Sequence, residues 1–510
     1  MTRTTRFALL ASIAAAPVLV ACGSGSDGGP AVPTTSGGPA SGGTAGNGNG
    51  ATGSGSSSGG GSSSSSSGGS TTPQSNGGKP MWTAHLGGPQ ADVGYALAAD
   101  KEGNVVLVGF YQGTANLGGV PMTSAGQVDF FVAKYDTAGN AMWVRPFGGP
   151  GNDMATGVAI DLSGNVYVSG ASDGAITIGG SSFGANGSTG TFLFSVDPLG
   201  NVLSAKAYGG DSYGTLTKVA VSANGTVGLA GSFKGTIDFG GGTALTATAG
   251  DGGAADYTAF VAEFDGGGNV QFANPLGSDS TTIAQGLAFK SDESVAVVGS
   301  FSGTGQFGTT TLTSLGQNDV FVAAFDSAGN PLWSKSWGGI TNDDGRGIGY
   351  DANGNLVVTG GFSSSVDFGG GAVTSKGGSD AFVMKLNSTH ALAWVQTFGG
   401  TSTDEAVSVS VDPTGNLLVG GLFESSMSVG GKTLTSSGDK DIFAINMGAT
   451  GSTTWAKQFG SAEADEGVGV TFDAKGNSFV TGYFRTNVDF GTGMQSSAGD
   501  DDIFIGAYAP

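Results

Sequence analysis

A unit of nearly constant length recurs along most of the chain, and this repeat constrains the fold more than any other feature. One unit runs from residue 333 to 393 and begins with Trp333. The positions that match Trp333 in the other units are Trp82, Trp143, Ser204, Phe272, Trp394 and Trp455. Successive positions are equally spaced, except for a longer interval between Ser204 and Phe272. Seven units predict a repeat architecture, in which each unit buries its apolar surface against its neighbours.

Each unit contains four short apolar segments. In the second unit they span residues 157–161, 166–170, 192–197 and 202–208. Segments that are rich in Val, Phe and Tyr and bounded by Asp/Gly/Asn turns are typical of antiparallel hairpins. Many of them are apolar on both faces, as in residues 105–108, which is typical of sheets stacked face to face.

Four antiparallel strands in each of seven units predict an all-β fold, a seven-bladed β-propeller with one four-stranded antiparallel sheet per blade. The last unit ends after its third strand, at residues 502–508, whereas the first begins with a spare fourth strand at residues 81–86. We expect this N-terminal strand to complete the last blade. The ring would then close without leaving an open sheet edge.

The repeated segments also resemble a known family. Residues 161–170 (DLSGNVYVSG), 412–421 (DPTGNLLVGG) and 380–385 (DAFVMK), together with Phe398-Gly399-Gly400, are similar to the bacterial SBBP-type β-propeller repeat. The resemblance covers essentially residues 80–510. It implies an extracytoplasmic propeller, in a family whose biochemical roles are mostly unassigned.

The N-terminus carries a targeting signal. Arg3 and Arg6 precede an apolar run at residues 7–20, which is too short to span a membrane as a helix. The run ends in Leu-Val-Ala-Cys at residues 19–22, which resembles the bacterial lipobox. This resemblance implies cleavage before Cys22 and lipidation of its sulfur. An ordinary secretory signal with a chance cysteine is the alternative.

These features divide the chain into three parts. Residues 1–21 are expected to be a lipoprotein signal peptide, residues 22–79 a Gly/Ser-rich disordered tether, and residues 80–510 the propeller. Gly23 and Ser24 follow the cysteine, where an Asp would resemble an inner-membrane retention signal. We therefore expect a lipid-anchored protein of the bacterial cell envelope, held at the outer membrane.

The amino-acid composition limits the classes of molecule that the chain can bind. The formal net charge of −21 and the pI near 4.2 argue against nucleic acid, whose phosphates require clustered Lys and Arg. A single Cys excludes an intramolecular disulfide and any multi-Cys metal site. The two histidines, His85 and His390, do not recur between units, and we interpret them as surface or inter-blade residues.

A pair of aspartates recurs in five blades. One Asp opens the third strand, and the second lies at a constant distance further along the chain, in the loop after Phe-Gly-Gly. The pairs are Asp129 with Asp153, Asp319 with Asp343, Asp380 with Asp404, Asp441 with Asp465 and, across ring closure, Asp502 with Asp92. The other two blades have Gly190 with Gly214 and Thr258 with Thr282. No pair is mixed, and both positions are expected on one face of the ring.

Two carboxylates placed together repel each other unless a cation or shared donors intervene. One hypothesis is that each pair binds Ca²⁺ at a blade junction, helped by Asp344, Glu405 or Glu466, since Ca²⁺ prefers oxygen ligands. Two alternatives remain open. Each Asp could instead accept backbone N–H groups within its own loop, or the two blades without the pair could share a divergent history.

The sequence favours a binding or scaffold function for a protein or glycan over an enzyme. Its polar residues recur in most units, whereas propeller enzymes usually carry a unique polar cluster near the central channel. No catalytic residue and no cofactor other than possible Ca²⁺ is assigned. The alternative is an extracytoplasmic hydrolase or lyase acting on polysaccharide. The recurring Trp is interpreted as inter-blade packing, and the loop extension near residues 251–257 as a candidate recognition element.

Overall fold

Asp-x-x-Gly-Asn sequences form the tight turns that join the strands. The computed structural model describes residues 77–184, 190–209, 217–248 and 257–510. In the turn at residues 351–355, Oδ1 of Asp351 accepts hydrogen bonds of 2.9 Å from the N–H groups of Asn353 and Asn355. Gly354 has a φ of 74°, which a residue without a Cβ adopts at little cost. The turns therefore end each strand at a position that is fixed locally.

In the described part of the chain, the strands assemble into seven four-stranded antiparallel sheets, one per blade, and in one blade the outermost strand pairs with an additional hairpin. The inner strands are β2 (Asp92–Ala99), β8 (Asp153–Ile160), β14 (Lys218–Val221), β20 (Thr282–Phe289), β26 (Asp343–Tyr350), β30 (Asp404–Val411) and β34 (Glu466–Phe472). The second strands are β3 (Val105–Tyr111), β9 (Val166–Ser172), β15 (Val227–Phe233), β21 (Val295–Phe301), β27 (Leu356–Asp367), β31 (Leu417–Val429) and β35 (Ser478–Phe484).

The two outer positions of each blade complete the sheets. The third strands are β6 (Asp129–Tyr135), β12 (Gly190–Val196), β18 (Thr258–Phe264), β24 (Asp319–Phe325), β28 (Ala372–Leu386), β32 (Lys432–Met447) and β38 (Asp502–Tyr508). The outermost strands are β7 (Ala141–Phe147), β13 (Val202–Gly209), β19 (Val270–Ser278), β25 (Pro331–Trp337), β29 (Leu392–Phe398), β33 (Thr453–Phe459) and β1 (Pro80–Leu86).

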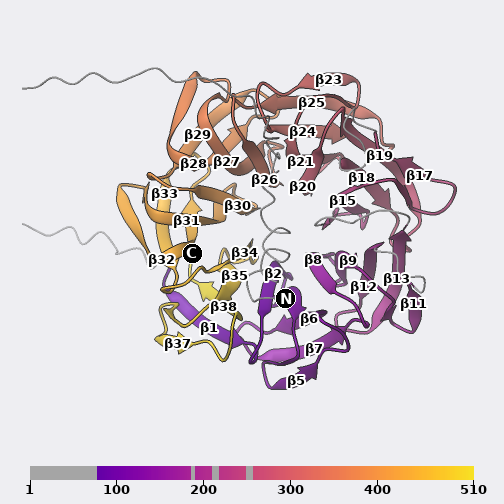
Figure 1. Cartoon of the computed structure of the whole chain (residues 1–510), viewed down its shortest axis with the longest axis vertical. Helices are drawn as coiled ribbons and strands as arrows, with labels where there is room; N and C mark the ends of the chain where they lie inside the picture. Colours follow the sequence, from indigo (N-terminus) through magenta and orange to yellow (C-terminus); the bar gives the residue numbers. More distant parts are fainter. Residues whose placement is uncertain (1–76, 185–189, 210–216, 249–256) are drawn as a thin grey trace, which may run out of the picture. The chain divides into compact units, whose positions relative to one another are not determined.

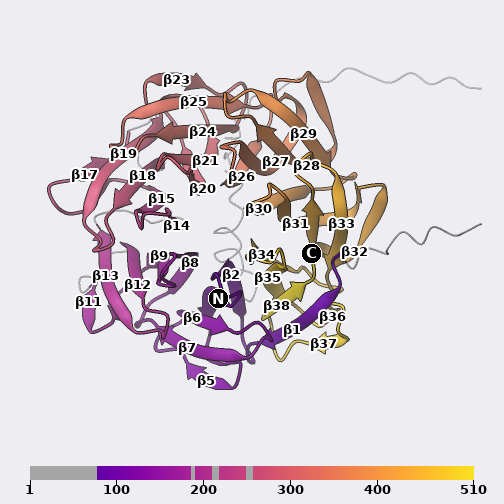
Figure 2. The same ribbon diagram turned by 180° about the vertical axis from the view of Figure 1, so that it is seen from behind.

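The blades are arranged as a ring, with the inner strands around its centre (Figures 1 and 2). Each inner strand contacts the inner strand of the next blade, and β34 contacts β2. The last blade has the order β1-β38-β35-β34, so the N-terminal strand completes it. Trp82 pairs with Ala507 and Leu86 with Ile503. The predicted propeller and its closure by the N-terminal strand are confirmed.

A small additional hairpin follows the second strand in five blades, which the expectation of four segments per unit did not include. These hairpins are β4 (Thr114–Leu117) with β5 (Val120–Thr123), β10 (Ile176–Ile178) with β11 (Ser181–Phe183), β16 (Thr236–Asp238) with β17 (Ala244–Thr246), β22 (Thr304–Phe307) with β23 (Thr310–Thr313), and β36 (Asn487–Asp489) with β37 (Met494–Ser496). In the other two blades the hairpin is continuous with β27 and β28, and with β31 and β32. Turn sequences such as Asp-Phe-Gly fold here as hairpin tips.

The core lies between the blades. Every residue of β3 and β6 is buried, as expected for strands that are apolar on both faces. The recurring Trp joins neighbouring blades: Nε1 of Trp82 donates a hydrogen bond of 3.0 Å to the carbonyl of Thr137 in the next blade. Nε1 of Trp143 and of Trp394 donates to the equivalent turn one blade further on. The interpretation of this Trp as inter-blade packing is confirmed.

The expected signal peptide (1–21) and nearly all of the expected tether (22–79) lie outside the described residues. Among the residues that the structure describes, no helix is long and apolar enough to cross a membrane.

Candidate binding site in the central channel and the aspartate pairs

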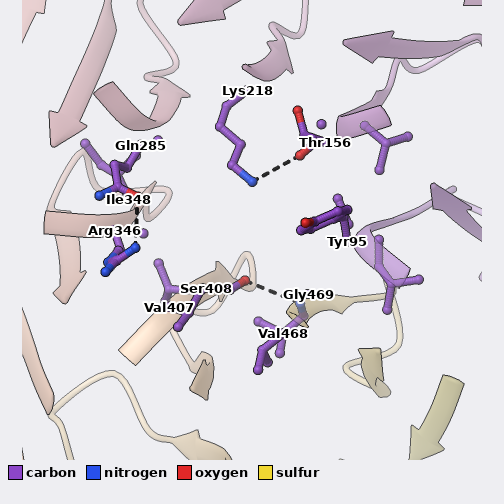
Figure 3. A pocket seen from close by; sticks show the side chains of 18 of the residues that line it. Tyr95, Thr156, Lys218, Gln285, Arg346, Ile348, Val407, Ser408, Val468 and Gly469 are labelled. Atoms are coloured by element: carbon purple, nitrogen blue, oxygen red, sulfur yellow. Dashed lines mark hydrogen bonds between the residues drawn. The ribbon is translucent and has the colours of Figure 1, made fainter. Parts of the chain in front are cut away.

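Three rows of seven residues, one row per register position of the inner strands, face the centre of the ring. The first row is Tyr95, Thr156, Thr217, Gln285, Arg346, Val407 and Val468. The second is Ala96, Gly157, Lys218, Gly286, Gly347, Ser408 and Gly469, and the third is Leu97, Val158, Val219, Leu287, Ile348, Val409 and Val470. All of these except Thr217 line one cavity of about 170 Å³ (Figure 3).

Members of the first row occupy β-bulges. In β2 the pairing with β3 skips Tyr95, and the same interruption occurs at Thr156, Gln285, Arg346 and Val407. A bulged residue leaves the regular ladder, so its side chain can be directed away from the sheet faces. The bulge therefore gives each blade one position at which a side chain can enter the channel without disturbing the core.

The second row is small because the inner strands approach one another closely. A Cβ at Gly286 would lie 2.9 Å from the carbonyl oxygen of Arg346, and a Cβ at Gly469 would lie 3.0 Å from that of Tyr95. Because glycine has no side chain, it allows the backbone of the neighbouring blade to approach closely at these positions. Lys218 is the exception in this row, since the others are Gly, Ala or Ser.

Arg346 enters the channel from β26 and is already paired. Its Nη2 lies 3.1 Å from Oε2 of Glu405 and 3.8 Å from Oδ2 of Asp344. Its Nη1 donates a hydrogen bond of 3.2 Å to Oε1 of Gln285. Burial works against the charge of Arg346, but the two carboxylates outweigh it and place the arginine pKa above its usual value.

Lys218 enters from β14 and has a different environment. Its Nζ donates a hydrogen bond of 3.0 Å to the carbonyl oxygen of Thr156. Burial, followed by the positive charge of Arg346, lowers the pKa of Lys218 to about 8. Among the described residues, no carboxylate lies within ion-pair distance of its Nζ. Figure 3 shows Lys218, Arg346 and Tyr95 directed toward the same space from three different blades.

The interpretation that polar residues recur in most units does not extend to this channel. Tyr95, Thr156, Lys218, Gln285 and Arg346 all differ from their equivalents in most other blades. Sequence reasoning missed them because it followed the residues that recur. Alignment of the inner strands would have found Lys218 and Arg346, since each is the sole charged residue in its row.

The aspartate pairs do come together, and each pair spans a blade junction. The second Asp opens the inner strand of the next blade, as Asp153 opens β8. Its backbone N–H donates to the carbonyl that precedes the first Asp: Asp153 to Val128 at 2.9 Å and Asp343 to Asn318 at 2.8 Å. A Cβ at Gly87 would lie 2.5 Å from Oδ1 of Asp502 and 3.0 Å from Oδ2 of Asp92. The members of a pair are therefore close neighbours, as the repeat spacing predicted.

Each carboxylate also caps its own loop. Oδ2 of Asp129 accepts a hydrogen bond of 2.9 Å from the Ala125 N–H, and Oδ2 of Asp153 accepts one of 2.7 Å from the Gly149 N–H. In the Thr pair, Oγ1 of Thr258 accepts a hydrogen bond of 3.0 Å from the Thr248 N–H. A hydroxyl thus performs the same capping without charge. Loop capping explains each position alone, but it does not require both positions to change together.

Burial leaves these pairs short of partners. Oδ1 of the third-strand Asp is buried without a hydrogen-bond partner in four pairs, at Asp129, Asp319, Asp441 and Asp502. Burial, opposed by backbone hydrogen bonds and reinforced by the partner Asp, raises the pKa of Asp92 to about 8. In the same way the pKa values of Asp343 and Asp404 rise to about 7. Burial also raises the pKa of Asp153, Asp319, Asp441 and Asp465 to about 6, and it raises the pKa of Asp129 and Asp380.

The carboxylates expected to assist a metal are engaged elsewhere. Asp344 and Glu405 face Arg346, and Oε1 of Glu466 lies 3.1 Å from Nζ of Lys440. Within the described ranges, no group of three or more His, Cys, Asp or Glu side chains is placed to hold a metal ion. A cation between two aspartates would therefore depend on backbone oxygens or water for its remaining ligands.

The remaining candidate residues have structural surroundings or lie outside the description. Nε2 of His85 lies 2.5 Å from Oδ2 of Asp502 at the ring closure, and His390 stacks on Trp333 with ring centroids 4.2 Å apart. His390 is thus an inter-blade residue, as predicted, whereas the contact of His85 joins two strands of the last blade. Cys22, Gly214 and all but Tyr257 of the loop extension lie outside the described residues.

Comparison with known proteins agrees with this architecture. A family model described as "SBBP: Beta-propeller repeat" matches residues 143–176 and 454–491. An uncharacterised WD repeat-containing protein of Acanthamoeba polyphaga mimivirus is 21% identical over 488 residues, which is 80% of this chain and 31% of that protein. The regulatory protein FlaEY of Caulobacter vibrioides is 26% identical over 267 residues, 48% of this chain and 28% of FlaEY. The chain thus spans less than a third of the length of these relatives.

Among solved structures, the polysaccharide lyase Uly1 is similar with a TM-score of 0.38 and 10% sequence identity. The similarity covers 81% of this chain and 89% of the lyase. A likeness of this extent says nothing about activity.

Proposed function

Because the chain is a β-propeller with SBBP-type repeats, we propose that it is a binding module of the bacterial cell envelope that holds a protein or glycan ligand at the central channel. The observation that carries this proposal is the convergence of Lys218, Arg346 and Tyr95 on one cavity from three blades that otherwise repeat one another. Rigid blades that present exceptional side chains at one point are a common basis of recognition.

The chemistry of the channel favours binding over glycoside hydrolysis. Hydrolysis of a glycoside usually needs one carboxyl group as acid and a second as base or nucleophile on either side of the scissile bond. The carboxylates closest to the channel cations, Asp344 and Glu405, are paired with Arg346. The groups left to meet a ligand are an ammonium, a phenol and an amide, which recognise polar groups. The hydrolase alternative therefore has less support.

Binding and hydrolysis can be tested side by side on the purified chain. A glycan array and a pull-down from cell-envelope extract would compare the wild-type chain with Lys218→Met/Arg346→Gln. Lys101→Gln, which changes an exposed lysine, is the control. We expect one ligand to be retained by the wild type and the control and lost by the double variant. Release of reducing ends from a polysaccharide by the wild type would support the enzyme alternative instead. Equal retention of the ligand by all three chains would show that the ligand does not bind in the channel.

Anchoring through Cys22 is the second part of the proposal. The lipobox-like residues 19–22 and the Gly/Ser-rich segment after them support a lipid anchor on a long tether. In cells fed radiolabelled palmitate, we expect label in the wild type and none in Cys22→Ser. We also expect the variant to move from the outer-membrane fraction to a soluble fraction. Equal membrane association of both chains would contradict the anchor.

A further inference from the structure

Lys218 lacks a counter-charge in a chain that is rich in carboxylates. The two lysines that are fully buried in the described chain, Lys134 and Lys385, each have an aspartate partner, at 2.8 Å and 2.9 Å. The channel has two cations, and Glu405 and Asp344 both serve Arg346. Nζ of Lys218 makes a neutral hydrogen bond to Thr156. Both nearby carboxylates are thus engaged with the guanidinium, and among the described residues Lys218 has no ion-pair partner of its own.

The fold carries a cost at this position. A partly buried ammonium beside a guanidinium is destabilised by lost hydration and by repulsion. Both effects lower the pKa of Lys218, yet its value of about 8 keeps most of the side chain charged at neutral pH. The equivalent residues of the other six blades are Gly, Ala or Ser. The fold of the blade thus does not require a lysine here, and an anion in the channel would offset the unfavourable free energy of burying its charge.

The surrounding groups suit an anion with a single charge. Burial raises the pKa of Tyr95 to about 12, so its hydroxyl stays protonated and can donate a hydrogen bond. The cavity has a volume of about 170 Å³. A carboxylate with several carbon atoms fits such a space. A single carboxylate can pair with the one ammonium in the described channel that has no ion-pair partner.

The third row indicates what the carboxylate is attached to. It consists of seven aliphatic residues: Leu97, Val158, Val219, Leu287, Ile348, Val409 and Val470. The hydroxyl groups of an acidic sugar would lose hydrogen bonds to water against this wall, since aliphatic side chains offer none in return. An aliphatic side chain next to a carboxylate would gain from burial there. This combination occurs at the C-terminus of a peptide that ends in a residue such as Val.

We propose that Lys218 and Tyr95 bind the C-terminal carboxylate of a protein partner whose last side chain is aliphatic and contacts the third row of the channel. This inference rests on the proposed binding function and narrows its ligand to a peptide chain end. Arg346 lines the same cavity, but its guanidinium is engaged by Glu405 and Asp344.

The test compares a free carboxylate with an amide. The probes are acetyl-Gly-Ala-Val with a free C-terminus, the same peptide with a C-terminal amide, and glucuronate. They are titrated against the full chain, with selectively ¹³C-labelled lysine followed by NMR and the Lys218 signal assigned by its loss in Lys218→Met. We expect the free acid to bind at least tenfold more tightly than the amide or glucuronate and to raise the pKa of Lys218.

Two variants separate recognition from folding. Lys218→Met should lose at least tenfold in affinity for the free acid while melting at the same or a higher temperature, because it removes a desolvated ammonium that has no ion-pair partner. Lys457→Met is the control, since Lys457 is another partly buried lysine whose pKa burial lowers, but it lies on the outermost strand β33. Lys457→Met should bind the peptide as the wild type does.

The outcomes distinguish this inference from the function on which it rests. Equal binding of acid and amide, or unchanged binding by Lys218→Met, would overturn the carboxylate site. If glucuronate or a glycan then still binds in a channel-dependent manner, the binding function stands and only the peptide end is wrong. If no probe, array glycan or extract protein binds in that manner, both proposals fail.

Discussion

At the scale of the residue, the first glycine of each Phe-Gly-Gly segment leaves space for the aspartate that opens the third strand. A Cβ at Gly399 would lie 2.3 Å from Cγ of Asp380, and one at Gly338 would lie 2.2 Å from Cγ of Asp319. Gly209, the equivalent residue of the second blade, has no described atom within 4 Å of its Cβ position. There the third strand opens with Gly190, which has no side chain. Glycine and aspartate are thus coupled by volume.

Gly399→Ala should therefore destabilise the propeller by about 1–3 kcal/mol, the usual cost of overpacking a close contact. Gly209→Ala should change the free energy of unfolding by much less, since its added methyl group meets open space. Chemical denaturation of both variants beside the wild type measures the difference. Equal losses would show that the glycine is needed for its backbone conformation and not for the aspartate.

At the scale of the element, each blade junction that carries an aspartate pair holds two buried carboxylates close together, and their negative charges destabilise the folded state. The pKa of Asp404 in the folded chain is about 7, above the ordinary aspartate value of 3.8. A folded pKa above the unfolded one means that the native state binds the extra proton. The junction is therefore most stable when protonated, and its stability is lost as the pH rises from about 4 through 7. The orphaned Oδ1 atoms are consistent with either a proton or a cation between the paired carboxylates.

Asp404→Asn should test this charge directly, since the amide keeps an oxygen for the Gly400 N–H. The wild type should lose stability between pH 5 and pH 8, and the variant should lose less of it. At about 1.4 kcal/mol per pKa unit, the difference at pH 8 is a few kcal/mol in favour of Asn. Parallel slopes of melting temperature against pH would contradict the assignment.

The calcium hypothesis predicts a further effect in the same experiment. Added Ca²⁺ should raise the melting temperature of the wild type at pH 8, EDTA should reverse the rise, and Asp404→Asn should respond less because one of its five pairs is lost. If neither Ca²⁺ nor EDTA shifts the melting temperature, protonation and not a bound cation reduces the repulsion between the paired carboxylates.

At the scale of the whole molecule, closure of the ring depends on one strand. β1 pairs with β38, and Nε2 of His85 reaches Oδ2 of Asp502 across the junction. Backbone hydrogen bonds continue to the ends of the described chain, where the Gly78 N–H donates to the carbonyl of Ala509 at 2.9 Å. Without β1, the edge of β38 would be open to another chain.

A chain that begins at residue 91 should therefore lose several kcal/mol of stability, at about 1 kcal/mol for each backbone hydrogen bond, and should self-associate. A chain that begins at residue 77 keeps β1 and is the control, expected to melt as the full chain does. Sedimentation and thermal denaturation measure both effects. A monomeric, equally stable chain from residue 91 would show that closure is not needed.

Much of this architecture follows from the sequence alone because it rests on local signals that repeat. Turns such as residues 351–355 end strands through bonds between near neighbours in the chain, and the regular period counts the blades. The spare strand at residues 81–86 predicted closure. The constant offset between the two aspartates predicted their pairing, since four of the five pairs lie within one period of the repeat and the fifth follows from closure. These inferences needed no knowledge of the distances between distant residues.

Only the tertiary structure determines which side chains line the central channel. Tyr95, Lys218 and Arg346 lie in three different units, and each is only one departure from a repeated strand until closure brings the seven inner strands together. The charge balance of Arg346 depends in the same way on Glu405, a residue of the next blade. The sequence by itself determined the blades, because their bonds are local. Only the closed ring decided which exceptional side chains meet, because their contacts join residues that lie in different units of the repeat.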